Sequence, residues 1–78
     1  MNREKRPKLV ITFHTTTAAM GMEASCKAGK GRLIPVPREI TGGCGLAWCA
    51  EPHLEETLLQ VMEKNNIEYQ EKRVILLY

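Results

Sequence analysis

Apolar residues along the 78-residue chain follow two spacings, which predict four strands and two helices. Short runs rich in β-branched and aromatic residues predict strands, whereas apolar positions three and four residues apart predict a helix. Leu54, Leu58, Val61 and Met62 show the helical spacing. The predicted elements are, in chain order, a strand over 9–13, a helix over 18–28, an extended strand over 32–37, a strand over 46–49, a helix over 52–64 and a strand over 67–78.

Residues with special backbone preferences mark where these elements begin and end. A threonine among residues 15–17 is expected to cap the first helix by accepting an early backbone N–H, and Pro52 to begin the second. Pro35 and Pro37 cannot donate to a β-ladder, so the strand over 32–37 is predicted to lie at a sheet edge. Residues 1–8 are predicted to form a basic arm, and residues 9–78 a single domain.

This order of elements predicts an α+β domain with a ferredoxin-like split βαβ fold (β-α-β-β-α-β). In that fold a four-stranded antiparallel sheet carries both helices on one face. The strands are apolar on both faces, yet two helices cover only one. An uncovered apolar face predicts a homodimer through the sheet, with Trp48 or its strand neighbours at the contact.

Composition and charge exclude several classes of protein. The chain is 44% hydrophobic and 26% charged, which is ordinary for a globular domain. A net charge of +2 and an aromatic content of 5% do not indicate a nucleic-acid partner. No apolar run approaches the about 18 residues that would span a membrane, and the run over 9–13 is too short for the core of a signal peptide. We therefore expect a cytoplasmic location.

The predicted topology places one cysteine beside a helix start. The end of the first strand, the helix start and the turn between the second and third strands share one sheet edge, so His14, Thr15 and Thr16 should lie near Cys44. The positive end of a helix favours a thiolate, and the neighbouring glycines, Gly43 and Gly45 among them, leave the sulfur open to approach. Arg38 would favour the thiolate further if it folds back. This arrangement is what a nucleophilic or carrier thiol requires. It is equally consistent with a tight turn in which Cys44 is merely a small residue.

We expect the other cysteines to form neither a metal site nor a structural disulfide with Cys44. Cys44 and Cys49 are five residues apart, which is about 16 Å along a strand, and the odd offset places them on opposite faces. Cys26 is expected to face the core near Met22, and Cys49 to be a small half-buried residue. We therefore expect no metal and no bound cofactor, other than sulfur or selenium held covalently on a cysteine.

Three segments, and the predicted helix from Leu54 to Met62, resemble a known family. Arg32-Leu33-Ile34-Pro35-Val36-Pro37-Arg38-Glu39-Ile40 followed by Cys44-Gly45-Leu46-Ala47, together with Ile11-Thr12-Phe13-His14-Thr15-Thr16, is similar to the selenium/sulfur (Se/S) carrier-like family of small bacterial proteins. The resemblance implies that Cys44 is a carrier thiol, holding a persulfide or selenide, rather than part of a true enzyme. It also implies a donor such as a cysteine desulfurase and an acceptor such as selenophosphate synthetase. An arginine is common in the family where this chain has Cys49, so a resolving role for Cys49 stays open.

A second hypothesis is a non-catalytic dimeric ferredoxin-like module that binds a ligand or regulates. Thiol reactivity separates the two hypotheses, because a carrier should have one strongly reactive cysteine and a ligand module none.

Overall fold

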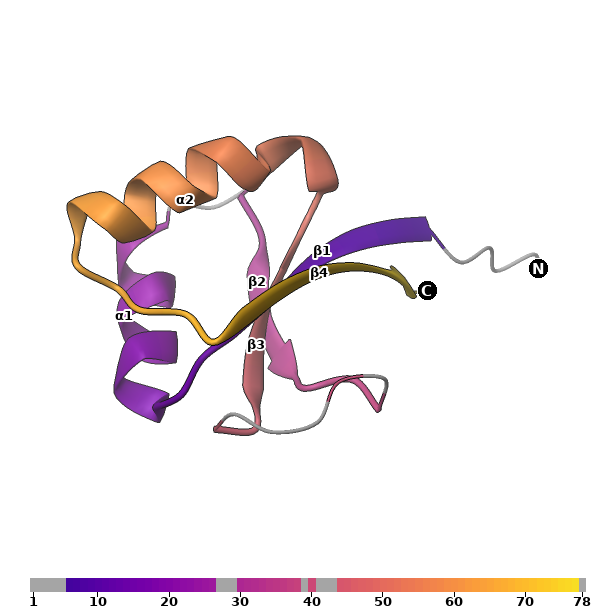
Figure 1. The fold of residues 1–78 in the computed structure, drawn as a ribbon, viewed down its shortest axis with the longest axis horizontal. Helices are drawn as coiled ribbons and strands as arrows, with labels where there is room; N and C mark the ends of the chain where they lie inside the picture. The colour runs from indigo at the N-terminus through magenta and orange to yellow at the C-terminus, as the bar shows by residue number, and fades with distance from the viewer. Residues whose placement is uncertain (1–5, 27–29, 39, 41–43, 78) are drawn as a thin grey trace.

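The computed structural model describes residues 6–26, 30–38, 40 and 44–77. The described chain forms four strands, two α-helices and one 3-10 turn (Figure 1). In chain order these are β1 (Arg6–Thr12), α1 (Thr16–Ser25), β2 (Arg32–Pro35), β3 (Leu46–Ala50), η1 (Pro52–Leu54), α2 (Glu55–Lys64) and β4 (Glu71–Leu77).

The four strands form one antiparallel sheet in the order β2-β3-β1-β4. β1 lies at the centre, paired with β3 from Leu9 to Thr12 and with β4 over its whole length. Both helices contribute to a single buried cluster on one face of this sheet. The predicted ferredoxin-like α+β fold is therefore confirmed, as is the edge position of β2.

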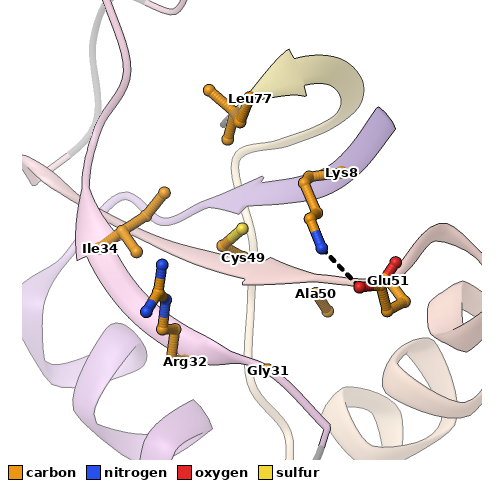
Figure 2. Close-up of a pocket in the computed structure, with 8 residues that line it drawn as sticks. All are labelled: Lys8, Gly31, Arg32, Ile34, Cys49, Ala50, Glu51 and Leu77. Atoms are coloured by element: carbon orange, nitrogen blue, oxygen red, sulfur yellow. Dashed lines mark hydrogen bonds and ion pairs between the residues drawn. The ribbon is translucent and has the colours of Figure 1, made fainter. Parts of the chain in front are cut away.

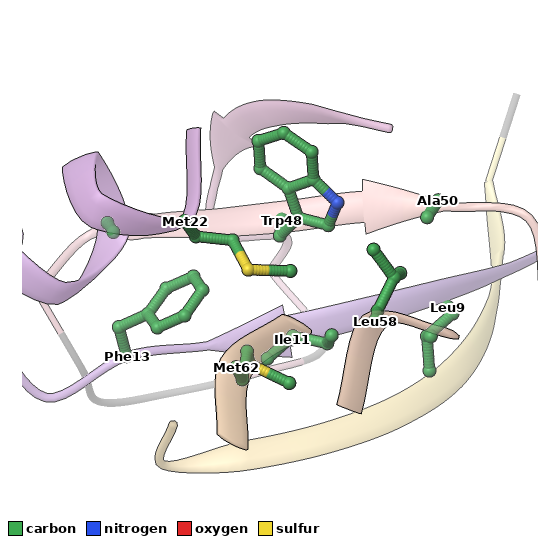
Figure 3. Packing of buried hydrophobic residues seen from close by; sticks show 9 residues of the cluster. Leu9, Ile11, Phe13, Met22, Trp48, Ala50, Leu58 and Met62 are labelled. Atoms are coloured by element: carbon green, nitrogen blue, oxygen red, sulfur yellow. The ribbon is translucent and has the colours of Figure 1, made fainter. Parts of the chain in front are cut away.

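The cluster between the helices and the sheet is the main core of the domain (Figure 3). Alternate residues of β1 and β3 point toward the helices because successive side chains of a strand face opposite sides. Met22 of α1, together with Leu58 and Met62 of α2, forms the helix side of the cluster. The sheet side of the cluster consists of Leu9, Ile11, Phe13, Trp48 and Ala50.

The outer face of the sheet is covered in part, which corrects the expectation of an open apolar face. Ile40 comes from the connection between β2 and β3 and packs against Val10 and Ala47, both fully buried. The amide of Ile40 donates to the Pro37 carbonyl at 3.0 Å, which fixes the turn that presents its side chain. Trp48 is 2% exposed and packs in the helix-side core. The homodimer, with Trp48 or its strand neighbours at the contact, stays a prediction.

The ends of several elements differ from those predicted. At β1, hydrogen bonding to the neighbouring strand outweighs the local sequence preference of the terminal residues. β1 begins at Arg6, since β4 continues beside it as far as Leu77; the last three residues of the expected basic arm therefore belong to the sheet. α1 covers Thr16–Ser25, with Thr15 as its N-cap. The second helix opens with η1 at Pro52 and ends before Asn65. β4 begins later than predicted, at Glu71.

Candidate functional site

Cys44 lies directly beside the end of β1, just before β3 begins. Its backbone amide donates a hydrogen bond to the carbonyl oxygen of Phe13 at 3.0 Å. This bond confirms that the turn before β3 meets the end of the first strand. The Cys44 side chain is half-buried against the helix-side core, with its Sγ 3.8 Å from the carbonyl oxygen of Leu46.

Gly45 keeps one side of the Cys44 backbone open. It is exposed and has a φ of +90°, a conformation that L side chains rarely adopt. A Cβ built at this position would meet no atom of the described residues beyond its chain neighbours within 4 Å. The carbonyl of Gly45 accepts a hydrogen bond from the Val36 amide at 3.0 Å, which ties the turn to the segment after β2.

The N-cap of α1 lies two residues beyond Phe13. Thr15 caps the helix, its hydroxyl oxygen accepting a hydrogen bond from the Ala18 amide at 3.1 Å. His14, Thr16 and Arg38 are exposed. Within the described residues, no hydrogen bond or ion pair joins any of these side chains to Cys44.

The structure therefore brings Cys44 to the expected strand and helix ends through its backbone. That the side chains of His14, Thr16 or Arg38 act on the Cys44 sulfur stays a prediction. The expected glycine neighbours Gly42 and Gly43 lie outside the described residues.

The other two thiols occupy different surroundings, as predicted. Cys26 lies at the end of α1 with its Sγ 3.9 Å from the Met22 Sδ, packed against the core. Burial raises the pKa of Cys26, with the charge of Lys30 acting in the opposite direction. Cys49 is half-buried on the outer face, opposite Val10, and burial raises its pKa too. Cys44 and Cys49 thus face opposite sides of the sheet, and all three cysteines are free thiols.

Two surveys of the described residues bear on bound metals and on membranes. No group of three or more His, Cys, Asp or Glu side chains among these residues is arranged to hold a metal ion. Neither α1 nor α2 has the length and apolar character that crossing a bilayer requires.

The sequence did not single out a group of charged residues around Cys49. Arg32 is the direct cross-strand partner of Cys49, and Lys8 and Glu51 line the same cavity. This group can be identified only when the register of β3 against β2 and β1 is known. A register shift of one residue in β3 would turn the Cys49 side chain toward the helices.

The fold and the site define a small α+β domain that presents a free thiol where its third strand begins, next to the start of its first helix. Residues 8–72 match the family described as "Putative Se/S carrier protein-like". Because this match covers most of the chain, the protein belongs to that family. No curated protein sequence and no solved structure gives a significant match.

Proposed function

We propose that this protein is a selenium/sulfur carrier that holds a chalcogen on Cys44 and passes it between partner enzymes. The observation that carries the proposal is the place of Cys44 in a chain of this family: a half-buried thiol beside the open backbone of Gly45. The half-buried position gives the bound atom some shelter from water, while the exposed glycine leaves a path for a partner.

The transfer is a thiol exchange in which atoms and charge balance. The Cys44 thiolate attacks the terminal sulfur of a donor persulfide, so a bond from the Cys44 sulfur to that atom forms and the donor's S–S bond breaks. Cys44 then carries the persulfide and the donor leaves as its thiolate. Handover repeats the step with an acceptor nucleophile attacking the outer atom, and selenium follows the same sequence. No net oxidation or reduction occurs in either step.

The environments of the other thiols support a single carrier cysteine. Burial raises the pKa of both Cys26 and Cys49. A raised pKa lowers the fraction of thiolate at neutral pH, and the thiolate is the reacting form. These two thiols should therefore accept sulfur slowly.

The proposed partners follow from the chemistry of the step. The donor is a persulfide-forming enzyme such as a cysteine desulfurase, and the acceptor is an enzyme such as selenophosphate synthetase. A reducing compartment such as the cytoplasm would keep the carrier thiol free. His14, Thr15, Thr16, Arg38 and Gly43 are proposed to contact the bound atom or the partner around it.

The test is a loading assay read by mass spectrometry. The protein is incubated with a cysteine desulfurase and cysteine, and in parallel with a donor selenopersulfide, whose thiolate leaves when the selenium is transferred. We expect it to gain one chalcogen atom, mapped to Cys44. Cys44→Ser should abolish the gain, whereas the matched variants Cys26→Ser and Cys49→Ser should retain most of it. Similar labelling of all three thiols would overturn the carrier proposal and favour the ligand-binding module.

A further inference from the structure

A cavity of about 450 Å³ lies on the outer face of the sheet, opposite the helix-side core against which Cys44 packs (Figure 2). This volume falls in the range of small-molecule sites. The cavity extends from edge strand β2, across the end of β3, to the paired ends of β1 and β4. The side chains that matter for its chemistry are Lys8, Arg32, Ile34, Cys49, Glu51 and Leu77.

The charged groups of the cavity leave one positive charge without a partner. Lys8 and Glu51 form an ion pair, with 2.5 Å between the Nζ and Oε1 atoms, so their charges offset each other. Arg32 is exposed, and no carboxylate in the described part of the chain pairs with its guanidinium. Among the described residues that line the cavity, two cations and one carboxylate give a net charge of +1.

The remaining walls are uncharged. Ile34 and Leu77 belong to the apolar cluster of the outer face and stand on opposite sides of the cavity (Figure 2). The Cys49 thiol lies between them at the base. Burial raises the pKa of Cys49, so this thiol is mostly neutral at pH 7, although the charges of Lys8 and Arg32 act in the opposite direction.

We propose that this cavity binds a small organic monocarboxylate, with Arg32 receiving the carboxylate and Ile34 and Leu77 contacting its apolar part. A guanidinium presents parallel N–H donors that match the two oxygens of a carboxylate. One ligand carboxylate also neutralises the single unpaired charge. The site is separate from the carrier thiol, and its occupancy does not depend on the chemistry at Cys44.

The test is a titration of the ¹⁵N-labelled full chain with sodium hexanoate, followed by NMR. We expect saturable shifts at the backbone amides of Arg32, Cys49 and Ala50. Hexylammonium chloride at the same ionic strength carries the same alkyl chain with the opposite charge and should give none. Arg32→Gln should weaken hexanoate binding about tenfold, as expected for loss of a charge-assisted hydrogen bond. Lys64→Gln, which removes an exposed cation on α2, should leave the affinity unchanged.

A second measurement requires no change to Arg32. In a Cys26→Ser/Cys44→Ser variant, Cys49 is the remaining thiol, and hexanoate should slow its alkylation by neutral iodoacetamide at least severalfold. The proposal is overturned if the NMR shifts do not saturate, if hexylammonium gives the same shifts, or if hexanoate leaves the alkylation rate unchanged.

Discussion

Gly31 lies so close to Trp48 that a Cβ at this glycine would stand 2.5 Å from the indole Nε1. The same Cβ would also lie 2.5 Å from the Cys49 carbonyl oxygen. The indole N–H donates to the Lys30 carbonyl at 3.1 Å, so the chain is held against the ring just before β2 begins. The single tryptophan of the core therefore depends on a glycine at position 31.

Gly31→Ala should destabilise the domain by at least about 2 kcal/mol, because a φ of +121° adds backbone strain to the clash. Urea unfolding followed by the fluorescence of Trp48 measures the change. Gly45→Ala is the matched control: its φ is also positive, at +90°, but in the described part of the chain no atom beyond its chain neighbours lies within 4 Å of the new Cβ. It should cost about 1 kcal/mol. Equal losses in the two variants would mean that the contact with Trp48 does not matter.

Leu58→Ala should cost about 2–5 kcal/mol, because Leu58 is fully buried between α2 and the sheet and its loss leaves a cavity. A domain of this size has little stability to spare, so a large part of the protein should be unfolded. Met20→Ala removes the same number of heavy atoms from a side chain that is 51% exposed on α1, and should change the free energy of unfolding far less. Urea unfolding of both variants checks the difference; similar costs would contradict the assignment of the core.

The Lys8–Glu51 ion pair should make stability depend on pH at the acid end. The hydrogen bond from Lys8 lowers the pKa of Glu51 below its ordinary value of 4.5. A group with a lowered folded-state pKa contributes stability that is present above the unfolded pKa and lost as pH falls through the folded pKa. Glu51→Gln should therefore flatten the decline in stability below pH 4.5. Glu68→Gln removes an exposed carboxylate in the connection between α2 and β4 and should preserve the wild-type profile, measured by urea unfolding across the acid range.

The fold was predictable from the sequence because each element carries its own local signal. The apolar run over 9–13 and the stripe from Leu54 to Met62 fix which faces are buried. Once the order of elements is known, few topologies satisfy the rules of connection. The approach of Cys44 to Phe13 follows from that topology, which is why the candidate thiol was placed correctly.

The packing on the outer face of the sheet was not predictable. The residues that cover this face come from the connection between β2 and β3, where the apolar residues show no regular spacing. Ile40 and Val36 are isolated apolar residues in a segment of prolines, glycines and polar residues, and only the folded turn shows that they pack on the cluster around Val10. Arg32 and Cys49 are cross-strand partners because of the register between β2 and β3, and the sequence around either residue does not indicate that register. The early start of β1 at Arg6 likewise depends on pairing with β4 and not on the charged residues themselves.

The two edges of the sheet differ in how well they are protected. β2 has four residues and ends at Pro35, and both features discourage pairing with another strand. β4 has seven residues without proline or glycine. On its helix side, Val74 is 52% and Leu76 56% exposed, although α2 reaches β4 through the Glu55–Lys72 ion pair. Such an edge is a template for another strand.

We expect β4 to pair with β4 of a second copy, giving a homodimer through the edge of the sheet and not through its outer face. A two-fold antiparallel arrangement brings Val74 of each copy against Leu76 of the other and keeps the basic residues Lys72 and Arg73 of the two copies apart. Light scattering at tens of micromolar should give the dimer mass for the wild type. Leu76→Lys should give a folded monomer, and His53→Lys, an equally exposed change near the start of α2, should stay dimeric. A monomeric wild type would exclude the dimer, and a dimeric Leu76→Lys variant would place the contact elsewhere.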